Sequence, residues 1–173
     1  MKGDLLEELM YEYFTLKGYL CLRNLPGKPK TKGGRDEIDL IAIKIGNKII
    51  SEIIWVEVTS YLSKGKSTVI QKFSKEKEEY LRGFLKSMYG LVYNNTIKKI
   101  FFVLYEHPKI MENKDLPAKI ITKKDILNEL PNLIQKYKEK YCELSGSKSG
   151  TSYITLPESF KLTELIDTIR KKS

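Results

Sequence analysis

The sequence predicts an α/β protein with a mixed central sheet flanked by helices. Two segments with apolar residues at helical spacing, residues 3–17 and 69–89, enclose a series of short β-branched runs. A dense apolar run at residues 97–106 follows the second helix. The resulting core order, α-β-β-β-α-β, is typical of an α/β sandwich. At 173 residues the chain is long enough to form one well-packed core.

The first helix and the strand after it are predicted from residues 3–24. Gly18 ends the helix, and the apolar residues at helical spacing before it are Leu5, Leu6, Leu9, Met10, Tyr13 and Phe14. A short strand at 19–24 follows. Residues 25–35, LPGKPKTKGGR, are rich in proline, glycine and lysine and predict a loop.

A β-hairpin is predicted next, with strands at 37–45 and 48–59 and a turn at Gly46 and Asn47. A basic connection, SKGKS at 63–67, leads to the second helix. The apolar residues expected on or near the buried face of that helix are Ile70, Phe73, Tyr80, Leu81, Phe84, Leu85 and Met88.

The remaining elements of the core are two strands and a helix. The run at 97–106 predicts a central strand, and residues 118–122 predict a shorter one. Residues 123–141 are expected to form a helix that is kinked or broken at Pro131, because proline lacks the backbone donor that the helix needs.

The segment SGSKSG at 145–150 is a linker in composition. We therefore expect one α/β domain over 1–144. The residues 145–173 are expected to add a strand and a helix that pack on the same domain, covering a sheet edge or forming a dimer contact.

The composition favours some classes of function and disfavours others. The net charge of +9, from 31 Lys+Arg against 22 Asp+Glu, favours a polyanionic partner, although a lysine-rich surface that keeps the protein soluble explains it equally well. No apolar run approaches the ~20 residues of a membrane-spanning helix, and the N-terminus lacks a signal-peptide pattern, so we expect a cytoplasmic protein. Two cysteines and one histidine are too few for a Cys/His zinc site.

Two carboxylates interrupt the strongly apolar strands of the hairpin. Because side chains alternate along a strand, Asp39 shares one side with Glu37, Ile41 and Ile43, while Ile38, Leu40 and Ala42 share the other. In the next strand Trp55, Glu57 and Thr59 share a side. If the strands pair about the turn, Asp39 and Glu57 meet on one face. Their repulsion would be relieved by a hard divalent ion such as Mg²⁺, which could activate water and stabilise charge on a phosphate.

An ordinary solvated face is the alternative interpretation of Asp39 and Glu57, with lysines as their partners. It is weakened because the surrounding segments, EIDLIAI and IIWVEVT, look buried on both faces, and on the residues alone the two interpretations stay equally open. The other acids of this region are assigned differently. Glu37 is expected to support a metal ligand, and Asp36 and Glu52 are expected to be surface charges.

These residues resemble the PD-(D/E)xK nuclease superfamily. Its pattern is an acidic residue on the first helix, an aspartate in the second strand and Glu-x-Lys at the end of the third. The matching residues are Glu7 or Glu8, Asp39 within GGRDEIDLIA and Glu57 within WVEVTS. The likeness covers roughly residues 3–105 and is greatest to archaeal Holliday junction resolvases and small bacterial nuclease-like proteins. The distance from the acid to Gly18 in LLEELMYEYFTLKGYLCLRN favours Glu7.

The resemblance implies a restriction-endonuclease-like core and a metal-dependent DNA endonuclease, acting on branched or nicked DNA and forming a homodimer. It implies that Mg²⁺ or Mn²⁺ is held by Asp39, Glu57 and the Val58 carbonyl, with Glu7 as a ligand directly or through water. It also suggests that Gln71 could hydrogen-bond the metal-bound water or a phosphate, although an ordinary solvent-facing residue fits that position equally well.

Thr59 departs from the family pattern, because the motif lysine is expected at this position. That lysine is thought to act on the attacking water and to offset phosphate charge. Three explanations remain open. Another lysine could supply the amine, from Lys64, Lys66 or Lys72, whereas Lys44 should point away from Asp39. Two metal ions could make the lysine dispensable. Catalysis could also be lost.

Basic residues on both sides of the site are the expected DNA contacts. They are Lys28, Lys30, Lys32 and Arg35 before the acidic strand and Lys64, Lys66 and Lys72 after the hairpin. Two alternatives to the nuclease remain: a nucleic-acid-binding protein on the same fold without catalysis, and an interaction subunit with no nucleic-acid role.

Overall fold

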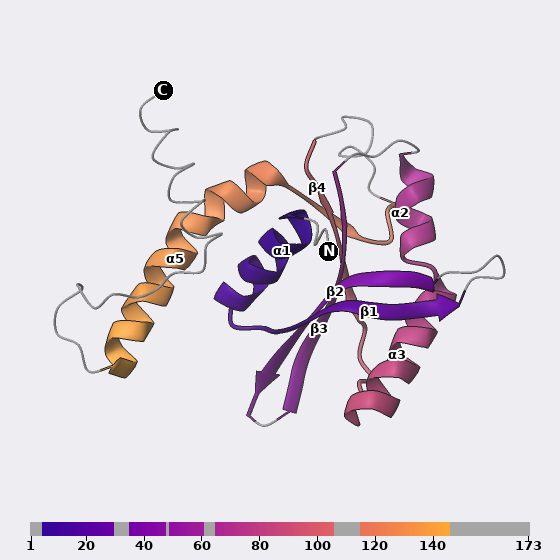
Figure 1. The fold of residues 1–173 in the computed structure, drawn as a ribbon, viewed down its shortest axis with the longest axis horizontal. Coiled ribbons are helices and arrows are strands. Elements are labelled where there is room, and N and C mark those ends of the chain that lie inside the picture. The colour runs from indigo at the N-terminus through magenta and orange to yellow at the C-terminus, as the bar shows by residue number, and fades with distance from the viewer. Residues whose placement is uncertain (1–4, 30–34, 48, 61–64, 106–114, 146–173) are drawn as a thin grey trace.

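The computed structural model describes residues 5–29, 35–47, 49–60, 65–105 and 115–145, with the backbone alone described at 28–29, 35–36 and 140–145 (Figure 1). The helices and strands in chain order are α1 (Leu5–Leu16), β1 (Leu20–Pro29), β2 (Arg35–Gly46), β3 (Ile49–Thr59), α2 (Lys66–Lys72), α3 (Lys75–Tyr89), β4 (Lys98–Val103), β5 (Lys119–Thr122) and α5 (Lys123–Ser145). The strands form one five-stranded sheet in the order β1-β2-β3-β4-β5.

The sheet is mixed, which confirms the predicted α/β class. Strands β1, β2 and β3 pair antiparallel, whereas β3, β4 and β5 pair parallel. The hairpin of β2 and β3 turns where predicted, at Gly46 and Asn47, and Asn47 takes the positive φ of 51° that such a turn requires. β3 lies in the middle of the sheet, and β4, expected to be central, lies beside it.

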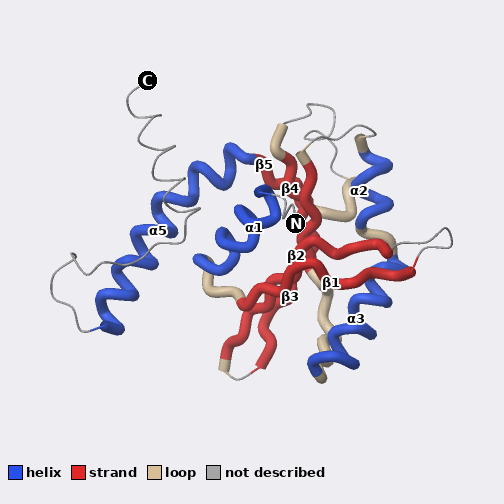
Figure 2. The backbone as a smooth tube through the Cα atoms, viewed as in Figure 1, coloured by secondary structure: helices blue, strands red, loops and turns tan. Residues whose placement is uncertain are grey.

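Helices cover both faces of the sheet, as Figure 2 shows. Helices α1 and α5 pack on one face over Leu40, Ala42 and Phe102. Helices α2 and α3 pack on the other face over Ile41 and Trp55. We call these the α1/α5 face and the α2/α3 face. Each face has its own buried apolar cluster, so the sheet is apolar on both sides at its centre.

Strands β1 and β2 change direction near Asp39, and this corrects the predicted alternation. The register pairs Arg23 with Leu40 and Leu25 with Ile38, so Asn24, at a positive φ of 52°, lies across from Asp39. Beyond this point Ile38 packs with the α2/α3 cluster, although simple alternation places it on the other side. A left-handed residue inside a strand interrupts the alternation and turns the chain.

The predicted loop at 25–35 is shorter than expected. β1 continues to Pro29 and β2 begins at Arg35, so the loop is reduced to residues 30–34, which lie outside the described residues. Glycine and proline at 26–29 do not end the strand, because β2 pairs with it as far as Pro29 across an irregular register.

The second predicted helix, at 69–89, is two helices. α2 ends at Lys72 and α3 begins at Lys75, after Ser74, whose hydroxyl accepts a hydrogen bond from the Lys77 backbone N–H at 3.3 Å. Of the residues expected on or near the buried face, Ile70 and Met88 are exposed instead.

The third predicted helix extends further than expected and contains Pro131. α5 runs from Lys123 to Ser145, and Figure 1 shows its axis bending along its length, as a proline inside a helix requires. The linker and C-terminal extension predicted for 146–173 lie outside the described residues. Among the described helices, none is long and apolar enough to cross a membrane.

Candidate active site

Glu57 lies in the middle strand of the sheet and is 0% exposed to solvent. Its two carboxylate oxygens have different surroundings. Trp55 donates its indole N–H to Oε1 at 2.9 Å, and the Lys77 ammonium donates to the same oxygen at 3.4 Å. The Lys72 ammonium lies 2.7 Å from Oε2. A carboxylate in the sheet core therefore has two ammonium groups beside it.

The contact of Lys72 with Glu57 is a close ion pair. The ammonium lies 2.7 Å from Oε2, and Lys72 opposes the rise in the pKa of Glu57 through its charge and a hydrogen bond. An ionised carboxylate oxygen has more than one acceptor site, so Oε2 can bind a cation in addition to a donor.

Asp39 reaches the same place from the neighbouring strand. The ladder of β2 and β3 pairs Leu40 with Val56, and continuing that register by one residue places Asp39 opposite Glu57. Instead of a further ladder bond, the Asp39 carboxylate accepts the Val58 backbone N–H through Oδ2 at 2.7 Å. The change of direction at Asp39 therefore anchors its carboxylate beside the end of β3.

Burial raises the free energy of the charged form of both carboxyl groups. Burial raises the pKa of Glu57, the charge of Asp39 raises it further, and Lys72 and Lys77 oppose the rise. Burial likewise raises the pKa of Asp39, with Lys72, the Val58 N–H, Lys77 and Glu57 opposing it. For both groups burial prevails, so this site favours an additional positive charge or a proton.

The break between α2 and α3 brings both lysines to Glu57. Phe73 lies at the break and packs its ring against Trp55, with centroids 4.9 Å apart, and against Phe101 at 6.1 Å. Lys72 precedes this anchor and ends α2, while Lys77 lies in the first turn of α3. A buried aromatic residue thus holds the two helix ends over the same carboxylate.

Among the predicted site residues, the structure brings together Asp39, Glu57, Val58 and Lys72. Thr59 ends β3, is half-buried, pairs with Val103 and accepts the Leu104 N–H through its carbonyl oxygen at 3.2 Å. Lys72, one of the lysines that the sequence left open as a substitute for the motif lysine, places its ammonium 2.7 Å from Glu57.

Other predicted residues lie elsewhere. Glu7 is on α1, which packs on the α1/α5 face, and within the described chain no group of three or more Asp, Glu, His or Cys side chains is placed to hold a metal ion. Gln71 and Lys66 are exposed on α2. Lys44 points away from Asp39, as predicted, and donates to the Lys17 carbonyl at 2.9 Å.

The predicted basic contacts can be placed only in part. Lys28 and Arg35 lie within β1 and β2, with only their backbone described, and Lys30, Lys32 and Lys64 lie outside the described residues.

The remaining acids of the hairpin have other roles. Glu37 is exposed. Glu52, predicted to be a surface charge, is instead bound by the Tyr19 hydroxyl and the Lys98 ammonium, with its side chain 19% exposed. Glu52 thus ties β3 to β4 and to the segment before β1. The Asp36 side chain is not among those described.

Sequence reasoning missed Lys77 and the hydrogen-bonding role of Trp55. Lys77 lies in a dense run of charges, SKEKEE, which is typical of a solvated helix face. A signal for its burial was present, because Lys77, Leu81 and Leu85 are spaced four apart and all three are buried. If Ser74 is taken as the N-cap, α3 begins at Lys75, and Lys77, Leu81 and Leu85 then share its buried face.

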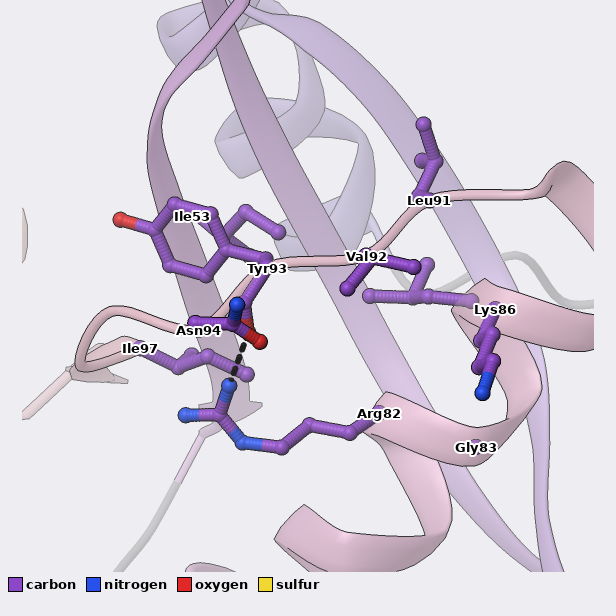
Figure 3. Close-up of a pocket in the computed structure, with 10 residues that line it drawn as sticks. Ile53, Arg82, Gly83, Lys86, Leu91, Val92, Tyr93, Asn94 and Ile97 are labelled. Atoms are coloured by element: carbon purple, nitrogen blue, oxygen red, sulfur yellow. Dashed lines mark hydrogen bonds between the residues drawn. The ribbon is translucent and has the colours of Figure 1, made fainter.

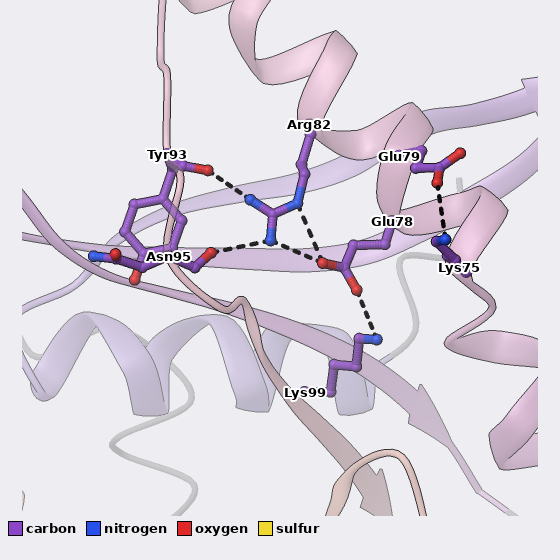
Figure 4. A network of polar contacts seen from close by, with 7 residues as sticks. All are labelled: Lys75, Glu78, Glu79, Arg82, Tyr93, Asn95 and Lys99. Carbon is purple, nitrogen blue, oxygen red and sulfur yellow. Dashed lines mark hydrogen bonds and ion pairs between the residues drawn. The ribbon is translucent and has the colours of Figure 1, made fainter.

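A polar network fastens α3 to the sheet next to the site (Figure 4). Arg82 donates to Glu78 at 2.8 Å and to the carbonyl oxygens of Tyr93 and Asn95 at 2.5 and 3.0 Å. Glu78 in turn pairs with Lys99 of β4 at 2.8 Å. The position of Lys77 is therefore supported by contacts on the following turn of the same helix.

A pocket of about 490 Å³ opens between α3 and the segment before β4 (Figure 3). Its lining is mainly apolar and includes Ile53, Leu85, Leu91 and Ile97. The guanidinium of Arg82 at its edge is already bonded to carbonyl oxygens. Since Asp39 and Glu57 do not line it, we assign the chemistry to the carboxylate–lysine cluster instead.

The donor set fits a small divalent cation such as Mg²⁺ or Mn²⁺. Mg²⁺ takes oxygen ligands, keeps several waters and is commonly bound through one or two carboxylates. Glu57 is a fully buried carboxylate with Asp39 beside it, and burial and the charge of Asp39 raise the pKa of Glu57, so an added cation is favoured there. Two carboxylates with the Val58 carbonyl would then suffice without Glu7.

No family model, curated protein or solved structure matches the chain. The class of the protein is therefore defined by its own structure. It is an α/β protein with a mixed five-stranded sheet and a buried carboxylate–lysine cluster on one face.

Proposed function

We propose that this chain is a divalent-metal-dependent nuclease that hydrolyses phosphodiester bonds in DNA. The observation that carries the proposal is the convergence of Asp39, Glu57 and Lys72, from two strands and a helix, at one point of the α2/α3 face. Two carboxylates and an ammonium are the groups that phosphodiester hydrolysis with a metal ion needs.

Each residue has a defined part in this proposal. Asp39, Glu57 and the Val58 carbonyl would hold Mg²⁺ or Mn²⁺, which when bound supplies an activated water and stabilises phosphate charge. Lys72 offsets the charge that develops on the phosphate, as the motif lysine would have done from position 59. The Thr59 hydroxyl is a candidate to hold the attacking water. Glu7 is not required.

The substrate and assembly belong to the same proposal. Branched or nicked DNA is the proposed substrate, in the cytoplasm, because a basic protein without a recognised base-reading motif is expected to respond to backbone and shape. A homodimer would present two such sites to a junction, and light scattering of the purified protein tests it.

The decisive experiment is a cleavage assay on branched, nicked and linear DNA with Mg²⁺, with Mn²⁺ and with EDTA. We expect metal-dependent cleavage that Asp39→Asn abolishes, because asparagine still accepts the Val58 N–H but carries no charge. Glu79→Gln, on the exposed side of α3, is the matched control and should cleave normally. Equal cleavage by wild type and Asp39→Asn would contradict the site assignment.

One observation favours a second candidate, a nucleic-acid-binding protein without catalysis. Lys72 and Lys77 already place two positive charges beside Glu57, so the cluster is neutral without a metal. This candidate predicts salt-sensitive DNA binding that Asp39→Asn leaves intact. It also predicts calorimetry in which neither Mg²⁺ nor Mn²⁺ binds.

A further inference from the structure

The two lysines at Glu57 are held in very different ways. Lys77 is enclosed: its side chain is 8% exposed, its ammonium lies 5.6 Å from the centroid of the Trp55 ring, and it shares Glu57 Oε1 with the indole N–H. Lys72 is 36% exposed at the end of a seven-residue helix, and its ammonium lies 2.7 Å from Oε2. The Lys77 ammonium is therefore enclosed, whereas Lys72 is partly open to solvent.

We infer that Lys72 is an exchangeable counter-ion that occupies Glu57 Oε2 in the metal-free protein and gives this oxygen up when a divalent cation binds. Trp55 and Lys77 remain on Oε1 throughout and act as positioning residues, because they hold the carboxylate in one orientation. The displaced Lys72 ammonium then lies at the edge of the site, where a substrate phosphate can accept it. This inference rests on the proposed function.

The charges of the cluster support an exchange rather than simple addition of a cation. With both carboxyl groups ionised, Asp39 and Glu57 contribute two negative charges that Lys72 and Lys77 balance with two positive charges, so the metal-free cluster is then neutral. A divalent cation added beside Lys72 would meet an ammonium in a buried site, where like charges repel strongly. Once Lys72 moves into solvent, this repulsion falls.

The net charge of the cluster also indicates the kind of substrate. With Lys72 displaced, Asp39, Glu57, Lys77 and a divalent cation leave one net positive charge in the buried site. A phosphodiester carries one negative charge and restores neutrality. The exchange therefore prepares the site for a phosphate anion and at the same time releases an ammonium that can bind it.

Exchange predicts that the two lysines affect cation affinity in opposite directions. Lys72 competes with the cation, so removing its charge should strengthen cation binding. Lys77 orients Glu57, so removing its charge should weaken it. If both lysines only stabilised the fold, removing their charges would not change the cation affinity in opposite directions.

The test is a titration with Mn²⁺ followed through Trp55, the single tryptophan of the chain, which donates to the same carboxylate. Isothermal calorimetry on the same samples gives the affinity independently. We expect Lys72→Met to bind Mn²⁺ about tenfold more tightly than wild type, within the usual range of coupling between two sites. Lys72→Met should nevertheless cleave DNA more slowly, since its ammonium is missing.

The control variants separate charge from packing. Lys72→Arg keeps the charge and should bind Mn²⁺ within about twofold of wild type. Lys75→Met, with a side chain 92% exposed on the next helix, should leave both the affinity and cleavage unchanged. Lys77→Met should bind Mn²⁺ more weakly. If its circular dichroism shows loss of the fold, the comparison of Lys72→Met with Lys72→Arg decides alone.

The outcomes distinguish this inference from the proposed function. If wild type binds Mn²⁺ and cleaves, and Lys72→Met binds equally or less tightly, the exchange is wrong and the nuclease stands. If Lys72→Met binds more tightly but no variant cleaves, the exchange stands and the nuclease is wrong. If neither wild type nor Lys72→Met binds Mn²⁺, both are wrong.

Discussion

Glu57 shows what a charge in a sheet core requires. Its carboxylate has no contact with solvent, so its charged form is stable only through Trp55, Lys77 and Lys72. The dependence is mutual, because Lys77 is enclosed too. Removing one partner of such a buried pair leaves the other charge without compensation, which costs more than the pair itself contributes.

We therefore expect Glu57→Ala to lower the free energy of unfolding by about 3 kcal/mol, the usual cost of breaking a buried pair from one side. The exposed pair of Lys75 and Glu79, 3.9 Å apart in Figure 4, is the comparison. Glu79→Ala should cost less than about 0.5 kcal/mol, because solvent screens this pair. Urea unfolding of both variants measures the difference, and equal costs would show that Glu57 is not buried as described.

Glu12 is a second buried acid, and it lacks a compensating lysine contact of this kind. It is 8% exposed on α1, and Oε2 has no hydrogen-bond partner within the described residues. Burial raises the pKa of Glu12 to about 7, the charge of Glu8 adds to the rise and Arg23 opposes it. In the folded protein Glu12 therefore keeps its proton near pH 6, whereas in the unfolded chain it has lost it.

The higher pKa of Glu12 in the folded protein predicts that the free energy of unfolding falls as the pH rises. Below the unfolded pKa of about 4.5 both states are protonated and Glu12 costs nothing, and the cost is complete above about pH 7. Glu12→Gln should remove that fall, so its stability relative to wild type should increase between pH 4.5 and 8 by ~1–3 kcal/mol. Urea midpoints at several pH values measure it. Glu139→Gln, which removes an exposed acid on α5, is the control for this measurement.

At the scale of elements, the break between α2 and α3 is what creates the site. One continuous helix over 69–89 would separate Lys72 and Lys77 by five residues, about 500° of helical rotation, and direct them to different faces. Phe73 and Ser74 interrupt the helix, and both ammonium groups then meet Glu57. The Ser74 hydroxyl stabilises the start of α3 by accepting the Lys77 N–H.

Ser74→Ala should lower the free energy of unfolding by about 1 kcal/mol, as is typical for loss of an N-cap. Ser87→Ala, near the exposed end of the same helix, is the control and should be neutral or slightly stabilising, since alanine is the better helix former. Thermal or urea unfolding measures both variants. A neutral Ser74→Ala would mean that α3 is held by its packing alone.

The elements that the sequence predicts correctly are those with a strong local pattern. The order of helices and strands, the turn at Asn47 and the shared side of Trp55 and Glu57 all follow from local patterns over a few residues. The helix break and the turning of the strands at Asn24 do not follow, because both depend on contacts between distant segments. Lys72 is one of three candidate lysines in the sequence, and its place beside Glu57 depends on a distant contact, the packing of Phe73 on Trp55.

At the scale of the whole molecule, the sheet separates two different faces. On the α1/α5 face the polar side chains of the two helices bind each other. Glu129 of α5 accepts the Tyr13 hydroxyl at 2.6 Å and pairs with Lys17 at 2.7 Å, which ties α5 to α1. On the α2/α3 face Lys72 remains partly exposed above a buried carboxylate. A polyanion that uses the proposed site must therefore approach over α2.

This asymmetry, with the net charge of +9, predicts how DNA binding depends on salt. Affinity should fall linearly on a plot of log affinity against log salt concentration, because each phosphate contact releases counter-ions. Lys66 is exposed at the start of α2, so Lys66→Ala should make that slope shallower by about 1, equally for unrelated sequences. Lys136→Ala, exposed on α5 across the sheet, changes the net charge by the same amount and should leave the slope as it was. Fluorescence anisotropy at several salt concentrations measures the three slopes. Equal changes in both variants would mean that DNA binds through overall charge and not at the α2/α3 face.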